Sequence, residues 1–201
     1  MRYRVPHRSA ATQAGLTPVL GRMSKIVVNL AKAVVLLFGI PAIGIATFDY
    51  TSVRPRLGQV EAILAQAPRL DASPPQLVRD LIDASERSPT PYAAKLVVSR
   101  VYPETRSNKR LIRELLWRIL LPMHLGKSSM YGLFATLSSN GTDTGLSSFS
   151  ALEFGKPLDQ LTPIQAATTV AVTRGPSWYL SDRNRLNERA LFLLKKSGHV
   201  P

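Results

Sequence analysis

The hydrophobic and polar positions divide this chain into one long apolar run and a series of amphipathic segments behind it. The apolar run covers residues 26–48 and is broken by Asn29 and Lys32. A transmembrane helix needs about 20 mainly apolar residues, and Lys32 lies near enough to the start of the run to extend its amine toward lipid headgroups. The pattern therefore predicts a transmembrane anchor over 26–48.

The residues before this run set the expected orientation of the anchor. Residues 1–25 carry no Asp or Glu and five cations, Arg2, Arg4, Arg8, Arg22 and Lys25. Positive charge beside a span favours the cytoplasmic side, so 1–25 is interpreted as a basic cytoplasmic tail. A cleavable signal peptide is the rival, because the small residues of Gly44-Ile45-Ala46 resemble a cleavage site. The long tail favours retention of the anchor.

Helical spacing dominates the segments that follow. Residues 49–72 are interpreted as a connector with one helical patch over 60–67. Ser73-Pro74-Pro75 then opens a helix with apolar side chains at helical spacing. A basic amphipathic helix is expected over 109–118 and ends near Pro122. Residues 138–150 show no strand alternation that would argue against a helical domain.

Two more helices are expected near the C-terminus. Gly155 can adopt the left-handed conformation that ends a helix, and Thr162-Pro163 has the form of an N-cap followed by proline at the first helical position. Gly175-Pro176 stops that helix. Ser181 or Asp182 can cap the last one, whose apolar face is formed by Leu186, Ala190, Leu193 and Leu194.

Composition restricts the chemistry. The chain has 201 residues, no cysteine and three histidines, His7, His124 and His199, which are too scattered in the sequence to indicate a metal site. Disulfide and thiol chemistry are therefore excluded, and no glycine-rich phosphate loop is visible. Beyond Asp49 the chain carries 20 Lys and Arg against 12 Asp and Glu, which favours an anionic partner. Because an exported domain meets lipid rather than nucleic acid, we expect membrane lipid or a lipid-linked pyrophosphate and no nucleic acid.

The C-terminal third carries an ordered set of motifs. Phe154-Gly155-Lys156 is followed by Leu161-Thr162, Ala166-Ala167, Pro176 and Tyr179. This order resembles the closing motif of the peptidoglycan glycosyltransferases, the family 51 transglycosylases, in which F-G-K leads to L-T-x-x-E-A-A and P-x-x-Y. Gln165 stands where that family usually has glutamate. The resemblance implies an all-α fold, in which one N-terminal transmembrane helix is followed by a small lysozyme-like helical domain, to which residues 73–201 are assigned.

Within this resemblance, Glu86 corresponds to the first catalytic carboxylate. In the family a helix ends in A-A-E-D-x-x-F, and its glutamate is the general base that deprotonates the acceptor sugar hydroxyl. The matching string here is Ala84-Ser85-Glu86-Arg87. Such a base requires a carboxylate within hydrogen-bond reach of the hydroxyl. Read without the resemblance, Glu86 is an ordinary glutamate at a helix end.

The family's next motif is largely missing. After its glutamate the family has a mobile flap and the signature G-G-S-T-I-T-Q-Q followed by a lysine. In this chain only Thr90 and Lys95 can be aligned with the last threonine and the lysine. Because the lost groups shape the donor site of the family, the sequence argues against efficient polymerisation.

The basic helix resembles the family's R-K-x-x-E motif. Arg110 matches the arginine and Glu114 the glutamate, whereas Leu111 replaces the lysine. The resemblance implies that Glu114 supports the departing donor while Lys95, Arg110, Arg113 and Lys127 bind its pyrophosphate, a task that suits guanidinium groups. Two other interpretations stay open: a solvated charged face, or a helix lying on the bilayer with Trp117 at the interface.

The family's K-x-x-I-L-E-x-Y-L-N motif is only partly retained. Lys127 fits the lysine, but Gly132 and Thr136 occupy the glutamate and asparagine positions. Family members often need a divalent cation at the donor pyrophosphate, but the chain has too few acidic residues near the motifs to name ligands.

Three functions follow as expectations. The first is an inner-membrane, single-pass protein with a periplasmic domain that engages lipid-linked disaccharide precursor or nascent glycan and polymerises weakly or not at all. The second is an active minimal peptidoglycan glycosyltransferase, and the third a non-catalytic module that binds envelope proteins.

Overall fold

The structure is a computed structural model that describes residues 28–30, 32–103 and 107–199. It divides into two compact units, Met1–Phe48 and Asp49–Pro201. The predicted basic tail, 1–25, lies outside the described residues.

The first unit is helical wherever it is described. It contains the π-helix η1 (Val35–Gly39) and the helix α2 (Ile40–Phe48), and its large apolar side chains are exposed. One helix, beginning at Val28, is long and apolar enough to cross a membrane by length and composition. The prediction of a long apolar N-terminal helix is therefore confirmed.

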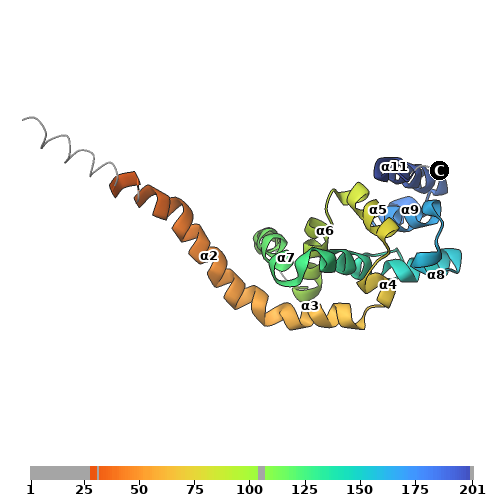
Figure 1. Cartoon of the computed structure of the whole chain (residues 1–201). Helices are drawn as coiled ribbons and strands as arrows, with labels where there is room; N and C mark the ends of the chain where they lie inside the picture. The colour runs from red at the N-terminus through yellow and green to blue at the C-terminus, as the bar shows by residue number, and fades with distance from the viewer. Residues whose placement is uncertain (1–27, 31, 104–106, 200–201) are drawn as a thin grey trace, which may run out of the picture. The chain divides into compact units, whose positions relative to one another are not determined.

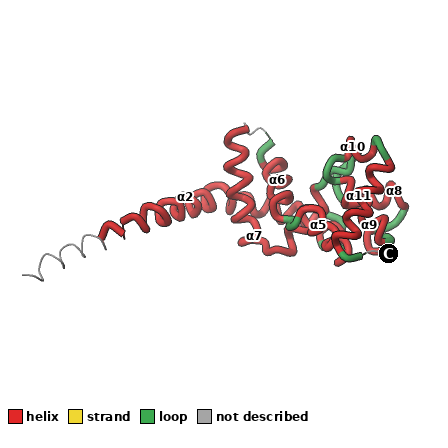
Figure 2. The backbone as a smooth tube through the Cα atoms, turned by 90° about the horizontal axis from the view of Figure 1, so that it is seen from above, coloured by secondary structure: helices red, strands yellow, loops and turns green. Residues whose placement is uncertain are grey.

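The second unit is built from helices of different lengths (Figure 1). In chain order they are η2 (Asp49–Val53), α3 (Arg54–Gln66), α4 (Arg69–Ala72), α5 (Gln76–Glu86), α6 (Thr90–Val101), α7 (Ser107–Leu137), α8 (Leu146–Phe154), η3 (Leu158–Gln160), α9 (Pro163–Val172), α10 (Pro176–Leu180) and α11 (Arg183–Ser197). No strand occurs in the described part of the chain, as Figure 2 shows; the only β-type pairing there is an isolated bridge between Ser139 and Thr144. The all-α prediction is confirmed, and the lysozyme-like arrangement stays a prediction.

The predicted connector, 49–72, is more ordered than the sequence pattern indicated. It forms η2, α3 and α4 and belongs to the second compact unit, with Val53, Val60 and Asp71 buried. The weak helical periodicity of α3 hid this helix, because its contacts with other helices rather than its own apolar stripe stabilise it. The boundary of the globular unit therefore lies at Asp49.

The basic helix also extends further than expected. α7 passes through Pro122 and changes direction at Gly126, whose φ of 77° and ψ of 165° are not helical. Pro122 lacks only one backbone donor, and the burial of Leu120 and Leu121, the two residues before it, helps to hold this turn of the helix in place. Glycine at 126 tolerates the positive φ that breaks the helix into two segments.

Two groups of helices form the core. α6 packs against α7, and α9 packs against both α5 and α11. The largest fully buried side chains are Trp117 and Phe134 of α7 and Leu81 and Ile82 of α5. Burying each such side chain stabilises the fold by about 1.5–3 kcal/mol, so these four contacts are a large share of the net stability.

The C-terminal helix boundaries fall where the sequence predicts them. Gly155 caps α8 with a φ of 63°, and Asp182 caps α11 by accepting hydrogen bonds from the N–H groups of Asn184 and Arg185. Thr162 and Gln165 form a reciprocal capping box at the start of α9. Gln165, which departs from the family motif, thus has a structural role in this chain.

Gly132 marks a close contact between α7 and α4. A Cβ atom on Gly132 would lie 2.4 Å from the carbonyl oxygen of Ala72, which is backbone and cannot rotate away. The position where the resembled family has a glutamate therefore has no space for a side chain here.

We predict that Gly132→Ala lowers the free energy of unfolding by about 1–3 kcal/mol, because α4 must shift away from α7. Gly58→Ala is the matched control, since a Cβ atom at this exposed position of α3 meets nothing within 4 Å. The control should stabilise the helix by about 0.5–1 kcal/mol. Urea unfolding of both variants followed by circular dichroism measures the two effects, and equal stability of the two variants would contradict the close contact.

Candidate functional site

Glu86 is the last residue of α5 and points into a polar contact with the segment after α9. Its Oε1 lies 3.0 Å from Nε of Arg174, and its side chain is only 10% exposed. The Ser85 hydroxyl donates to the same oxygen over 3.3 Å. The helix ends here because Arg87 adopts a left-handed conformation with a φ of 62°. The predicted general base is thus held in an ion pair by a guanidinium.

Tyr92 completes this group from the first turn of α6. Its hydroxyl donates to the carbonyl oxygen of Thr173 over 3.1 Å, and its ring packs against Phe134 at a centroid distance of 5.3 Å. Burial raises the pKa of Tyr92, the negative charge of Glu86 raises it further, and Arg174 opposes the shift. Tyr92 therefore stays a neutral hydrogen-bond donor at physiological pH.

Glu114 lies in a second group, on α7. Arg110 donates from Nε to Oε1 of Glu114 over 2.8 Å, one helical turn apart, and from Nη2 to the Ser99 hydroxyl over 2.5 Å. Ser99 belongs to α6, so this contact fixes the Arg110–Glu114 pair against the C-terminal part of that helix. The sequence motif is thereby preserved as an ion pair between its own two members.

α6 connects the two groups. Tyr92 and Ser99 are seven residues apart, which corresponds to about 10 Å of helix rise. Lys95 lies between them at positions i+3 and i−4, so the three residues share one face of the helix. Lys95 is exposed. We call the residues Glu86, Tyr92, Lys95, Ser99, Arg110, Glu114 and Arg174 the α6 polar strip.

The structure gives the other two predicted cations different surroundings from those of Lys95 and Arg110. The guanidinium of Arg113 lies 3.8 Å from the ring centroid of Tyr102, and Arg56 approaches the same ring at 4.4 Å. Lys127 follows the break at Gly126 and is exposed. Between Arg110 and that break lie about 24 Å of helix rise, so Lys127 is remote from Arg110.

Trp117 corrects one sequence-based interpretation. Its side chain is completely buried and packs edge-on against Tyr102 at a centroid distance of 6.1 Å. An interfacial position of Trp117 at a bilayer surface is therefore wrong, because this face of α7 is directed into the core.

A cavity that the sequence did not indicate adjoins the polar strip. Its volume is about 740 Å³, and its wall includes Asp71, Ser99, Arg100, Thr136 and Ser147. Ser99 is shared with the Arg110–Glu114 group, so the cavity opens beside that ion pair. The Thr136 hydroxyl is buried and has no hydrogen-bond partner among the described residues.

Asp71 is the buried carboxylate of this cavity. Its Oδ1 accepts hydrogen bonds from the Ser147 backbone N–H over 2.9 Å and from the Ser147 hydroxyl over 2.8 Å. Burial raises the pKa of Asp71 and outweighs the two hydrogen bonds, which lower it. Neither Asp71 nor Thr136 carries a local sequence signal for burial, since each depends on contacts between distant segments.

The described residues do not fit a divalent cation. No three His, Asp or Glu side chains come together among them in an arrangement that could hold a metal ion. The two glutamates of the strip are each paired with an arginine instead. The described residues therefore offer no ligand set for the cation implied by the resemblance.

Comparison with known proteins does not extend the resemblance. No protein-family model matches the chain, and no curated protein or solved structure matches it significantly. The transglycosylase resemblance therefore rests on the motifs, and the geometry of the polar strip is the structural basis for a functional proposal.

We predict that Asp71 makes stability depend on pH in a defined direction. Below the ordinary Asp pKa of 3.8 the carboxyl is neutral in both states, whereas at higher pH the unfolded chain ionises first and the native state is penalised. The unfolding free energy of Asp71→Asn relative to the wild type should therefore rise between about pH 4 and pH 7.

Urea unfolding across this pH range tests the effect, with Asp159→Asn as the control for loss of an exposed carboxylate. A difference between Asp71→Asn and the wild type that stays constant with pH, or falls, would contradict the raised pKa.

Proposed function

We propose that this chain is an inner-membrane-anchored, transglycosylase-like protein that engages a lipid-linked disaccharide precursor or nascent glycan and polymerises it weakly or not at all. The α6 polar strip is the observation that carries the proposal. It aligns the two carboxylates that match family motifs with Lys95 and Arg110 on one side of the helical unit, next to a cavity large enough for a sugar ring.

Binding of the precursor is supported by the cations of the strip. Lys95 is exposed, and Arg110 is 41% exposed while it still contacts Glu114 and Ser99. A pyrophosphate is a dianion or more at neutral pH, and guanidinium and ammonium groups bind its oxygens through charge-assisted hydrogen bonds. The net positive charge beyond Asp49 adds long-range attraction to an anionic headgroup.

The contacts and the burial of Glu86 support weak polymerisation. A general base must reach the acceptor hydroxyl with a free carboxylate oxygen. Oε1 of Glu86 is already engaged by Arg174 and Ser85, and the side chain is almost completely buried. Proton abstraction would therefore have to use Oε2, on a side chain that is only 10% exposed and that the ion pair with Arg174 holds in place.

The family motifs that this chain lacks also support binding without efficient polymerisation. Donor-site catalysis depends on preorganised groups that stabilise charge on the departing pyrophosphate. Gly132 and Thr136 occupy positions where the family has a carboxylate and an amide, and Gly132 has no room for a larger residue. The retained groups therefore suit binding better than turnover.

The test is binding and turnover of lipid-linked disaccharide-peptide by the full-length protein in detergent. We expect Lys95→Gln and Arg110→Gln each to weaken binding by about tenfold or more, since a hydrogen bond to a charged group contributes about 1.5–3 kcal/mol. Lys195→Gln, which removes an exposed lysine of α11, should leave binding unchanged.

Products sized on a gel distinguish the alternatives. Little or no polymer, with no difference between the wild type and Glu86→Gln, is the expected result; Glu153→Gln is the control, because Glu153 is another arginine-paired glutamate. Polymer that disappears in Glu86→Gln would instead identify an active minimal transglycosylase. Absence of binding would leave the envelope interaction module as the remaining function.

A further inference from the structure

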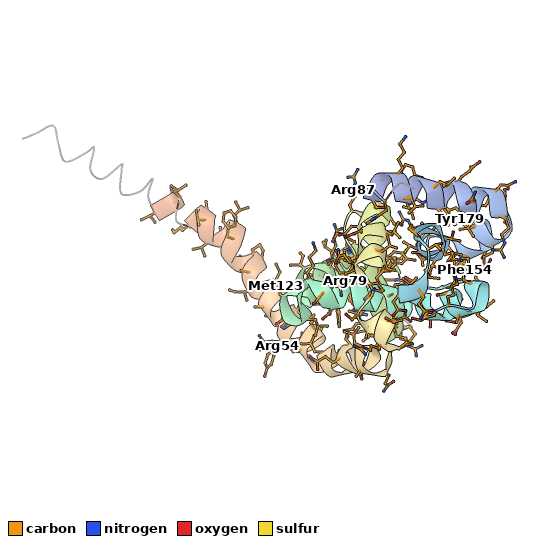
Figure 3. All side chains as sticks on the ribbon, turned by 45° about the vertical axis from the view of Figure 1, so that its right-hand side comes forward. Arg54, Arg79, Arg87, Met123, Phe154 and Tyr179 are labelled. Atoms are coloured by element: carbon orange, nitrogen blue, oxygen red, sulfur yellow. The ribbon has the colours of Figure 1, made fainter. Side chains whose placement is uncertain are left out.

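The first segment of α7 exposes a continuous row of large apolar side chains. Leu111, Ile112, Leu115, Ile119 and Met123 are between 46% and 75% exposed. They repeat at intervals of three and four residues, so they form one stripe along the helix, about 18 Å long. Met123, at one end of this α7 stripe, is labelled in Figure 3.

The α7 stripe is held outward by the packing on the opposite side of the same helix. Trp117 and Leu121 are completely buried, and Leu120 is nearly so. The Tyr102 ring contacts Trp117, and its hydroxyl donates to the Ser52 carbonyl oxygen over 3.0 Å. Rotating α7 to hide the stripe would expose this core, so the stripe requires an external partner or stays in water at a cost.

Cations border the stripe on both sides. At about 100° per residue, Arg118 falls along one edge of the stripe and Lys109 along the other, and both are exposed. An apolar stripe flanked by Lys and Arg is the pattern of a helix that lies in the interface of an anionic bilayer.

The C-terminal end of the α7 stripe lies next to the first residue of the globular unit, Asp49. His124, next to Met123, lies with Nε2 2.6 Å from Oδ1 of Asp49. Arg54 donates from Nε to Oδ2 of the same carboxylate over 2.9 Å. Asp49 directly follows Phe48, the last residue of the apolar run, so the chain leaves the predicted anchor at the residue that holds this end of α7.

We propose that the α7 stripe inserts into the surface of the membrane in which the chain is anchored, as a second membrane contact of the globular unit. The proposal rests on the membrane anchoring contained in the proposed function. Lipid is favoured over a protein partner because His124, at the end of the stripe, contacts Asp49, the residue that follows the predicted anchor in the chain, and because the cations at the edges of the stripe match anionic headgroups.

Insertion of the α7 stripe would set the height of Arg110, a member of the α6 polar strip, above the membrane. Arg110 lies on the side of α7 that faces α6, opposite the stripe. A helix is about 10 Å wide, so Arg110 would stand roughly 10 Å above the acyl boundary. This is the depth of the headgroup region, where the pyrophosphate of a membrane-bound precursor is located.

The absence of cysteine in the chain makes a depth measurement direct. Single cysteines at Leu115 and Ile119 would carry nitroxide spin labels in the full-length protein, reconstituted into vesicles of phosphatidylethanolamine and phosphatidylglycerol. Leu36→Cys reports on the anchor. Leu152→Cys, at a position 71% exposed on α8, is the matched control outside α7. Thermal unfolding of each labelled variant verifies that the fold is unchanged.

Relaxation by oxygen, which partitions into lipid, is compared with relaxation by a water-soluble nickel chelate. We expect labels at 115 and 119 to show an oxygen-to-nickel accessibility ratio several times that at 152 and to resemble the label at 36. A water-like ratio at 115 and 119 with a lipid-like ratio at 36 would overturn the second contact and leave the anchor intact.

Two other outcomes would also overturn the inference. Low accessibility to both reagents, with spin–spin broadening that grows with protein density, would show that a second copy covers the stripe. A water-like ratio at 36 as well as at 115 and 119 would remove the anchoring on which both proposals rest. Binding of lipid-linked disaccharide-peptide in detergent does not depend on these readings, so failure of the second membrane contact is distinct from failure of ligand binding by the α6 polar strip.

Discussion

The packing of α6 against α7 is the contact on which the rest of the globular unit depends. α6 turns small and branched residues, Ala93, Ala94, Val97 and Val98, toward the interior and buries all four. Phe134 and Trp117 of α7 are buried as well, and their rings contact Tyr92 in the first turn of α6 and Tyr102 just after its end. Because both helices are fixed by this core, their other faces have defined directions.

The exposed faces of α6 and α7 differ in polarity. The face of α6 that carries Tyr92, Lys95 and Ser99 is polar and contacts the Thr173 carbonyl oxygen and the Arg110 guanidinium, whereas the outer face of the first segment of α7 is apolar. A domain that binds a lipid-linked pyrophosphate needs both surfaces at adjoining depths, since the ligand has a polar headgroup and an apolar chain. The break at Gly126 changes the direction of α7 between the first segment, which carries the apolar stripe, and the second segment, which carries the buried Phe134.

The sequence predicts the parts of this architecture that depend on local chemistry. Helix ends at Gly155, Thr162 and Asp182 follow from capping preferences, and the apolar run over 26–48 follows from composition alone. Contacts between distant segments were not predictable in this way. α3 has little periodicity, Asp71 is buried only because Ser147 meets it, and Glu86 is neutralised by an arginine that lies 88 positions further along the chain. Trp117 shows the same limit, since an amphipathic pattern does not say which face of a helix meets the core.

The central claim is that the α6 polar strip meets a lipid-linked disaccharide in the membrane. A photoactivatable benzophenone amino acid placed at Lys95 in the full-length protein, irradiated in membranes that contain radiolabelled precursor, measures this contact directly. The account predicts that precursor is cross-linked to the protein from position 95 and not from the exposed position Lys195. Equal labelling from both positions, or none from position 95, would contradict it.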